Sequence, residues 1–491
     1  MLNGRAAVAL AFALVFAAGC QLVDHPRAPA SAAASAPTTR PGALRTDPAL
    51  AGAGDPMFPT LGNAGYDIEH YDLDPTWSPD RRDLSGTVSI TATALRELNT
   101  FDLDFAGMTI DRVTVDGHPA RFLRFDSEVV IGPAAAVAGG ATFAVAVTYN
   151  GTPGALRYAG GRSTSQLGWL STGRTTYTTQ EPYGAHGWFP CSDHPSDKAS
   201  YTFHITAPAA LTVVANGAMT GNPGARDTRR WTYDEPAPMA TYLVTLAIGT
   251  YTLHHEKGPH GLPMTFAYFP ADEAKVLPML RKSAAQIRFF ESLFGPYPFT
   301  TYGVLVTDVA DDQTMETQTL VTLGRGLATD ASTLYRPGEG DTVLAHELAH
   351  QWFGDAVTPA RWTDMWMNEG WATYAERLYD DAVLHTPLAA SLALLRLREG
   401  PARRADGPGG RPTPANMSNG HVYYGPALML NGLRRQMGDT AFFAMARAWV
   451  HDNLGQSRTR ADFTHLVRTY AHRDLSANID QWLDSPTMPA G

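Results

Sequence analysis

Apolar and polar side chains alternate along much of the first half of the chain. Over residues 87–94, threonine and serine alternate with valine, isoleucine and alanine, and similar runs recur between about residues 67 and 253. Asp116-Gly117 and Asn150-Gly151 are among the dipeptides that separate these runs. Alternation with a period of two buries one face of a strand, and such dipeptides form tight turns. The pattern predicts an antiparallel β domain over residues 58–254.

The spacing of apolar residues becomes helical after residue 255. Apolar side chains recur every three or four residues from Leu277 to Phe290, and Gly295-Pro296 ends this pattern. A short strand pattern covers 302–307, and further helical patterns lie near 388–397, 427–437 and 440–450. These patterns predict a mainly helical second domain with a small sheet over residues 255–491. The chain as a whole is therefore expected to be an α+β protein.

The N-terminus carries the features of an export signal. Arg5 is followed by an apolar run over residues 6–18, and Ala17-Ala18-Gly19-Cys20 resembles a bacterial lipobox. We interpret residues 1–19 as a signal peptide and Cys20 as the lipidated first residue of the mature chain. Plain secretion with an incidental cysteine is the alternative. Residues 20–57 are rich in alanine, proline, serine and threonine, which predicts a disordered tether.

The composition narrows the range of partners and compartments. The 491 residues are 44% hydrophobic and 18% charged, which is typical of a globular protein large enough for two or three domains. The net charge is −10 and no basic block is present, so we expect no nucleic acid partner. Because a lipidated Cys20 would leave only Cys191, no intramolecular disulfide is expected. The expected location is an exported, membrane-anchored lipoprotein on the periplasmic face or cell surface.

A metal-binding pattern stands near the two-thirds point of the chain. The sequence reads His346-Glu347-Leu348-Ala349-His350, and Glu369 follows in Met367-Asn368-Glu369-Gly370-Trp371. Residues four apart share a helix face, so His346 and His350 can bind one metal ion together. With Glu369 as third ligand and Glu347 beside them as a base, the pattern is typical of one catalytic zinc ion. The alternative is two surface histidines, which the apolar residues flanking the motif disfavour.

Four stretches together resemble one family, the aminopeptidase N family of gluzincin metallopeptidases, to which leukotriene hydrolases also belong. They are His346–Gly354 with Glu369, Gln313-Thr314-Met315-Glu316-Thr317, Glu181-Pro182 followed by Phe189–Pro195 and Lys198-Ala199, and Tyr423-Tyr424-Gly425-Pro426-Ala427. The resemblance runs from about residue 65 to Pro489. It implies a β-rich N-terminal domain followed by a thermolysin-like catalytic domain. It also implies a zinc aminopeptidase that acts on peptides with a free N-terminus.

The resemblance assigns roles to further residues. Glu347 would activate the zinc-bound water, and Tyr423 would stabilise the oxyanion, with Tyr424 as the alternative phenol. Glu316 and Glu181 would hold the free α-amine of the substrate. Met315 and Thr314 lie in the strand that pairs with the peptide in relatives.

Some positions depart from the family pattern. Gln313-Thr314 replaces Gly-Ala, Thr317 replaces Asn, and Pro426 stands in the Tyr423 stretch. Asp311 and Asp312 lie where relatives have residues of the first side-chain pocket, although both are also consistent with surface acids.

Two other functions stay open at this stage. A thermolysin-type zinc endopeptidase shares the zinc chemistry but has no use for an ammonium clamp, so Glu316 with Glu181 disfavours it. A catalytically silent peptide-binding lipoprotein needs no general base, so Glu347 disfavours it.

The N-terminal motif generates a direct prediction. Mass spectrometry of the mature protein should find a first residue at Cys20 that carries acyl chains, because stable membrane anchoring needs more than one chain. An unmodified terminus that begins at another residue would contradict lipidation.

Overall fold

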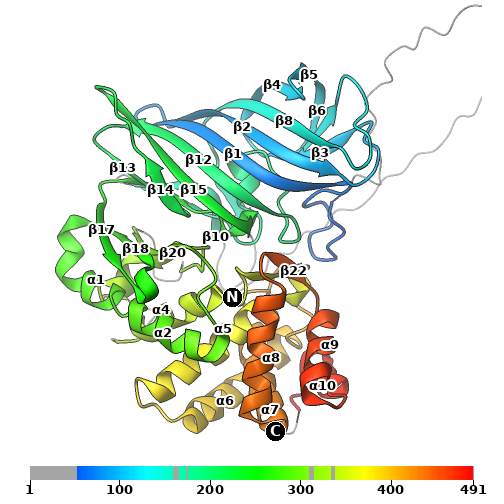
Figure 1. The fold of residues 1–491 in the computed structure, drawn as a ribbon, viewed down its shortest axis with the longest axis vertical. Helices are drawn as coiled ribbons and strands as arrows, with labels where there is room; N and C mark the ends of the chain where they lie inside the picture. The colour runs from blue at the N-terminus through cyan, green and yellow to red at the C-terminus, as the bar shows by residue number, and fades with distance from the viewer. Residues whose placement is uncertain (1–51, 159–164, 173–174, 309–313, 333–337, 490–491) are drawn as a thin grey trace, which may run out of the picture. The chain divides into compact units, whose positions relative to one another are not determined.

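The computed structural model describes residues 52–158, 165–172, 175–308, 314–332 and 338–489. The predicted signal peptide, Cys20 and residues 20–51 of the predicted tether lie outside the described residues. In Figure 1 the first strands are drawn in blue, and the helices from α6 on are drawn in yellow to red.

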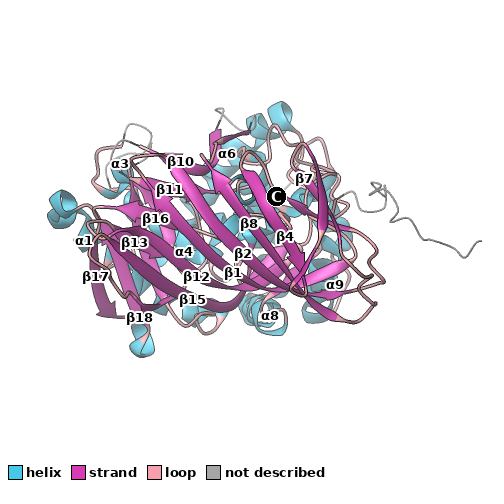
Figure 2. Cartoon of the chain, turned by 90° about the horizontal axis from the view of Figure 1, so that it is seen from above, coloured by secondary structure: helices cyan, strands magenta, loops and turns pink. Residues whose placement is uncertain are grey.

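The first part of the chain forms three sheets. Its strands are β1 (Tyr66–Ser78), β2 (Asp83–Ala94), β3 (Phe101–Asp104), β4 (Thr109–Val115), β5 (His118–Pro119), β6 (Arg121–Phe125), β7 (Glu128–Gly132), β8 (Thr142–Gly151), β9 (Leu156–Tyr158), β10 (Ser165–Ser171), β11 (Thr176–Thr179), β12 (Lys198–Pro208), β13 (Thr212–Ala215), β14 (Ala218–Gly221), β15 (Thr228–Ala240) and β16 (Leu246–Gly249). The eight-stranded sheet has the order β14-β15-β12-β1-β2-β8-β4-β5, and Figure 2 shows its long strands side by side. The five-stranded sheet is ordered β13-β16-β11-β10-β9, and the three-stranded sheet is ordered β3-β7-β6.

The alternation in the sequence corresponds to burial in this part. In β2 the side chains of Val88, Ile90, Ala92 and Ala94 are buried, while the residues between them are not. One apolar core joins the sheets, in which Trp77 packs on Trp169 with ring centroids 5.1 Å apart. The predicted face therefore packs against the other sheets.

One pair of strands in the large sheet departs from the antiparallel prediction. β1 and β12 run parallel, with Leu73 opposite Phe203, while the other neighbouring pairs of this sheet are antiparallel. The segment from β2 to β11 lies between these strands in sequence, which supplies the long connection that a parallel pair needs. Alternating side chains indicate strands but not their direction, so the sequence pattern missed this.

The second part of the chain is mainly helical around a four-stranded sheet. Its strands are β17 (Thr252–Lys257), β18 (Pro263–Tyr268), β19 (Tyr302–Thr307) and β20 (Val321–Gly324), in that order, and a separate pair is formed by β21 (Val357–Pro359) and β22 (Gln456–Arg458). Its helices are α1 (Glu273–Leu280), α2 (Ser283–Phe294), α3 (Arg325–Ala328), α4 (Gly340–His350), α5 (Trp366–Ala382), α6 (Leu388–Asp406), α7 (His421–Met437), α8 (Asp439–Asp452), α9 (Arg460–Ala471) and α10 (Ser476–Asp484). Since β17 starts at Thr252, this part begins slightly before the predicted boundary at residue 255.

The single helix predicted from Leu277 to Phe290 is divided into α1 and α2. Around Arg281 and Lys282 some backbone hydrogen bonds reach back three residues, one fewer than in an α-helix. The Lys282 N–H, for example, donates to the Met279 carbonyl oxygen at 2.9 Å. Apolar spacing continues across this turn, which is why the pattern did not reveal it. The predicted end at Gly295 is correct, because Gly295 follows α2 with a positive φ of 95°.

The last residues of the predicted tether are packed instead. The carboxylate of Asp55 is 1% exposed and accepts bonds from the backbone N–H of Met57 at 2.7 Å and of Trp362 at 2.7 Å. Nε2 of His194 lies 3.2 Å from the same carboxylate. Asp55 thereby joins His194 of the β-rich part to Trp362 of the helical part. The composition of residues 52–57 is typical of a linker, but these bonds to distant residues fix their backbone.

Asp55→Ala should destabilise the fold. It leaves the buried N–H groups of Trp362 and Met57 without an acceptor, and each such loss costs about 1–3 kcal/mol. Urea unfolding should therefore show a clearly lower midpoint for this variant. The matched control is Asp80→Ala, which removes an exposed carboxylate. Equal midpoints for the two variants would contradict a joining role for Asp55.

Candidate metal centre and active site

Helix α4 carries the first three residues of the predicted site. Its apolar face, which includes Leu344 and Leu348, is fully buried in the core of the helical part. His350 is 1% exposed and Glu347 is 5% exposed. The alternative of two histidines on a solvated surface helix is therefore wrong.

Three side chains converge to a metal-ligand arrangement. Nε2 of His346 lies 3.1 Å from Nε2 of His350 and 3.2 Å from Oε2 of Glu369, which comes from α5. Nε2 of His350 lies 3.5 Å from the same Glu369 oxygen. Tetrahedral bonds of about 2.0–2.1 Å to zinc place neighbouring ligand atoms about 3.3–3.4 Å apart. The three predicted ligands therefore fit one zinc ion.

Glu347 lies beside these ligands rather than among them. One of its carboxylate oxygens lies within 4.8 Å of ligand atoms of both His350 and Glu316. Burial raises the pKa of Glu347 to about 7. A carboxylate with a raised pKa next to a metal site is suited to accept a proton from water and release it again.

Each histidine has a partner on its other ring nitrogen. Nδ1 of His350 lies 3.1 Å from the backbone carbonyl oxygen of Phe353, and Nδ1 of His346 lies 3.3 Å from Oε2 of Glu376. Sequence analysis missed Glu376. Its signal is the spacing of seven residues from Glu369, which is about two turns on one face of a helix.

Tyr423 is the phenol next to the ligand set. Its hydroxyl donates to Oε1 of Glu369 at 2.8 Å, and its ring lies against that of His346 with centroids 6.2 Å apart. The adjacent Tyr424 instead packs against the apolar core and lies close to Gly420.

The packing of α5 on α7 brings Tyr423 to this place. A Cβ on Gly370 would lie 2.5 Å from Cβ of Pro426, so only glycine allows this approach. The proline that departs from the family pattern is thus in direct contact with the residue after Glu369.

Two further acids stand near the centre with unsatisfied oxygens. Glu316 is 3% exposed, and among the described residues neither its Oε1 nor Oε1 of Glu181 has a hydrogen-bond partner. Burial raises the pKa of both carboxyls, and the charges of Glu316, Glu369 and Glu347 raise that of Glu181 further. A buried carboxylate without a partner is unfavourable unless a cation joins it. The pair is therefore suited to bind a positively charged group.

Gln351 holds Glu316 in place and was also missed by sequence analysis. Its Nε2 donates to the Glu316 carbonyl oxygen at 2.9 Å and to Oδ2 of Asp355 at 2.6 Å. Its Oε1 accepts from the Thr319 N–H at 2.9 Å and from the Tyr297 hydroxyl at 3.1 Å. The only sequence signal is its position directly after His350.

The remaining predicted substrate residues lie along the same segment. Met315 and Thr322 exchange two backbone bonds of 3.0 and 2.8 Å, which places Met315 beside β20. Thr314 precedes it and is half-buried, and the Thr317 hydroxyl donates to the Leu320 carbonyl. Gln313, Asp311 and Asp312 lie outside the described residues.

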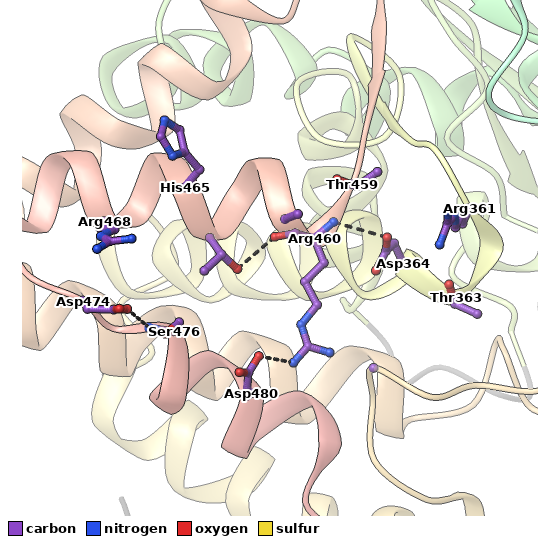
Figure 3. A pocket seen from close by; sticks show the side chains of 13 residues that line it. Arg361, Thr363, Asp364, Thr459, Arg460, His465, Arg468, Asp474, Ser476 and Asp480 are labelled. Carbon is purple, nitrogen blue, oxygen red and sulfur yellow. Dashed lines mark hydrogen bonds and ion pairs between the residues drawn. The ribbon is translucent and has the colours of Figure 1, made fainter.

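A separate surface pocket of about 740 Å³ lies where the short helix η6 (Trp362–Asp364) meets α9 and α10. Figure 3 shows Arg460 in this pocket, with its side chain directed to Asp480 and its backbone N–H to Asp364. None of the predicted metal or substrate residues lines it. Its central arginine is already paired within the protein.

Comparison with known proteins places this geometry in a family. The model of the peptidase M1 N-terminal domain matches residues 68–243, and that of the peptidase family M1 domain matches residues 279–406. A solved M1 zinc metallopeptidase from Deinococcus radiodurans is 30% identical, with 89% of this chain and 99% of that chain covered and a TM-score of 0.79. This chain belongs to peptidase family M1. The predicted family resemblance and the α+β fold are thereby confirmed, and zinc is the metal of this family's centre.

Other M1 relatives are longer. Leucine aminopeptidase 2 of Candida glabrata is 27% identical over 69% of this chain and 51% of its own length. Glutamyl aminopeptidase of Homo sapiens is 30% identical over 45% of this chain and 25% of its own length. This chain thus spans about half or less of these curated relatives. A mutant form of the Deinococcus radiodurans M1 enzyme was solved with a Tyr-Ser-Ala substrate, at 28% identity and a TM-score of 0.81.

The geometry assigns different roles to His350, a metal ligand, and to Glu347, a base, and substitutions can distinguish the two roles. His350→Ala should raise the zinc Kd by more than about 100-fold, since even changes around metal ligands cost about 10–100-fold. Glu347→Gln should bind zinc normally but lose about 10²–10⁴-fold in kcat, because an amide accepts no proton at neutral pH. Metal analysis and turnover on aminoacyl-nitroanilides measure both. Full zinc occupancy in His350→Ala, or near-native kcat in Glu347→Gln, would contradict these roles.

Proposed function

We propose that this chain is a zinc-dependent aminopeptidase that removes the N-terminal residue from peptides. The observation that carries the proposal is the pair of unpartnered carboxylate oxygens on Glu316 and Glu181, beside a zinc site and its base. Among the groups of a peptide, a free α-ammonium group occurs only at the N-terminus, so a site that binds it selects that end of the substrate. The names of the M1 relatives, which are aminopeptidases, support the same reading.

Different residues of the chain carry out different steps of the proposed reaction. When bound, zinc polarises the scissile carbonyl group and lowers the pKa of water. Glu347 takes the proton from the attacking water and passes it to the leaving amine. The hydroxyl of Tyr423, which donates to Glu369 in the structure, would donate to the oxyanion as it develops. Such a donor is worth roughly 3–4 kcal/mol in other enzymes.

The ammonium clamp determines which bond is cut. Glu316 is fixed through its backbone by Gln351, which directly follows the last residue of α4, His350. An ammonium group held there stands at a set distance from the metal ligands, so the first peptide bond reaches the catalytic residues. Each charge-assisted hydrogen bond contributes roughly 1.5–3 kcal/mol.

Both alternatives lose support from the same residues. A thermolysin-type endopeptidase binds the middle of a chain and would gain nothing from two acids that each keep a buried oxygen without a partner. A silent peptide-binding lipoprotein would gain nothing from Glu347, whose burial beside the metal ligands is unfavourable without a catalytic use. The M1 relative solved with a tripeptide substrate also supports peptides as the substrate class.

Export and membrane anchoring through Cys20 are part of the proposal. They rest on residues 1–20 alone, which the structure does not describe. Within the described ranges, no helix combines the length and apolar character needed to cross a bilayer. A lipid on Cys20 would supply the attachment, and the packed residues from 52 on would connect it to the folded part.

Substrates with a blocked amine should be rejected. Acetylation removes the positive charge and leaves Glu316 and Glu181 unpaired, so kcat/KM should fall at least about 100-fold, which is roughly 2.7 kcal/mol. Glu316→Gln should lower kcat/KM on free-amine substrates, narrow this discrimination and leave zinc bound. Glu97→Gln, an exposed acid, is the matched control. Equal rates on acetylated and free peptides would instead favour the endopeptidase.

A further inference from the structure

His346 lies between two carboxylates of the same helix. Its Nε2 faces Glu369 at 3.2 Å, and its Nδ1 faces Glu376 at 3.3 Å. The two acids are seven residues apart on α5, so they project from the same face on turns that are two apart. Glu376 is 7% exposed and does not belong to the groups of side chains whose ligand atoms converge. It therefore contacts a ligand without contacting the metal position.

The two histidines differ in what faces Nδ1. For His350 it is the neutral carbonyl oxygen of Phe353 at 3.1 Å, whereas for His346 it is a carboxylate. In both cases an acceptor on Nδ1 fixes the ring proton there and leaves the lone pair on Nε2 for the metal. A charged acceptor also draws the proton more strongly, which makes the imidazole a better electron donor.

Glu376 is itself held by a chain of side chains. Its Oε1 lies 2.7 Å from Nη2 of Arg377, whose Nη1 lies 2.9 Å from Oδ2 of Asp380. The hydroxyl of Thr342, on the zinc helix α4, donates to Oδ1 of Asp380 at 2.7 Å. The chain leads from α5 back to α4, so it fixes the side chain of Glu376 relative to the helix that carries His346.

The charges in this chain do not cancel. Two carboxylates, Glu376 and Asp380, share the single guanidinium of Arg377. Glu376 directs one oxygen to Arg377 and the other to His346, so one of the two carboxylates that share this guanidinium also faces a metal ligand. Both acids are largely buried, so bulk water screens this charge only weakly.

We infer that Glu376, held by Arg377 and Asp380, is a positioning residue that fixes the ring orientation and Nδ1 proton of His346 and thereby sets the zinc affinity. Its effect reaches the metal only through His346. Its loss should therefore weaken binding without abolishing the site. Changes to residues of this kind typically cost about 10–100-fold in metal affinity.

Zinc affinity of the full chain tests the inference. The metal-free protein is titrated with zinc against a chelator of known affinity, for the wild type, Glu376→Gln, Glu376→Asp and Asp381→Asn. We expect Glu376→Gln to raise the zinc Kd by about 10–100-fold, and Glu376→Asp, which keeps the charge but shortens its reach, to raise it less. Asp381→Asn is the matched control, because Asp381 lies on the same helix and accepts only from the Leu388 N–H among the described residues. It should leave the zinc Kd unchanged.

A second measurement separates positioning from a general structural effect. Proton–nitrogen spectra of the zinc-loaded, ¹⁵N-histidine-labelled protein should show the proton on Nδ1 for both ligand histidines, His346 and His350. Glu376→Gln should shift the signals of one of them and leave the other in place.

A zinc Kd of Glu376→Gln within about twofold of wild type, or an equal rise in Asp381→Asn, would overturn the inference. Should Glu376→Gln fail to fold, an unchanged zinc Kd in Glu376→Asp would also overturn it. Failure of the wild type to bind one zinc ion would contradict the metal centre itself, which is a distinguishable result.

Discussion

The packing of α5 against α4 is the constraint on which the rest of the site depends. Two ligand atoms come from α4 and one from α5, and they must meet within 3.1–3.5 Å at a place with little water. Aromatic side chains fix the two segments, since the rings of Phe353 and Trp371 stack at 4.2 Å with an angle of 2°. The packing of these two helices therefore sets the positions of the three metal ligands. Helix α7 packs against the same helix α5 where Gly370 meets Pro426, and this contact brings Tyr423 to Glu369.

An excess of buried acids is the electrostatic counterpart of this packing. Glu181, Glu316, Glu347 and Glu369 surround one small volume, and burial or like charges raise the pKa of the first three. Buried like charges cost free energy, and a bound cation relieves that cost. Under the proposed function, a divalent metal ion and a substrate ammonium group would supply positive charge at two separate points. The clustered acids thus lower the stability of the fold locally, at the position where the proposed binding and catalysis take place.

The sequence predicted what depends on local pattern and missed what depends on distant partners. Burial alternates in β2 as the residue pattern indicated, and the spacing of His346, His350 and Glu369 was sufficient to identify the metal site. The direction of β12 against β1 could not be predicted, because alternation is the same in either direction. Gln351 and Glu376 were missed because a glutamine at a helix end or a glutamate within a helix is usually solvated, and only the tertiary structure shows what each one contacts. Residues 52–57 have the composition of a linker, and the bond from Trp362 to Asp55 crosses most of the chain.

That bond also places residues that precede the matched M1 N-terminal domain within the folded part of the chain. The matched M1 N-terminal domain starts at residue 68 and the first strand at Tyr66, yet Asp55 already bonds to both His194 and Trp362. Trp362 opens the turn that leads into α5 and its zinc ligand. A chain shortened to the family boundary would keep every catalytic side chain but lose the carboxylate that secures the approach to that helix. The stretch from residue 52 to β1 is therefore held, in part through Asp55, against the turn that precedes α5 and its metal ligand.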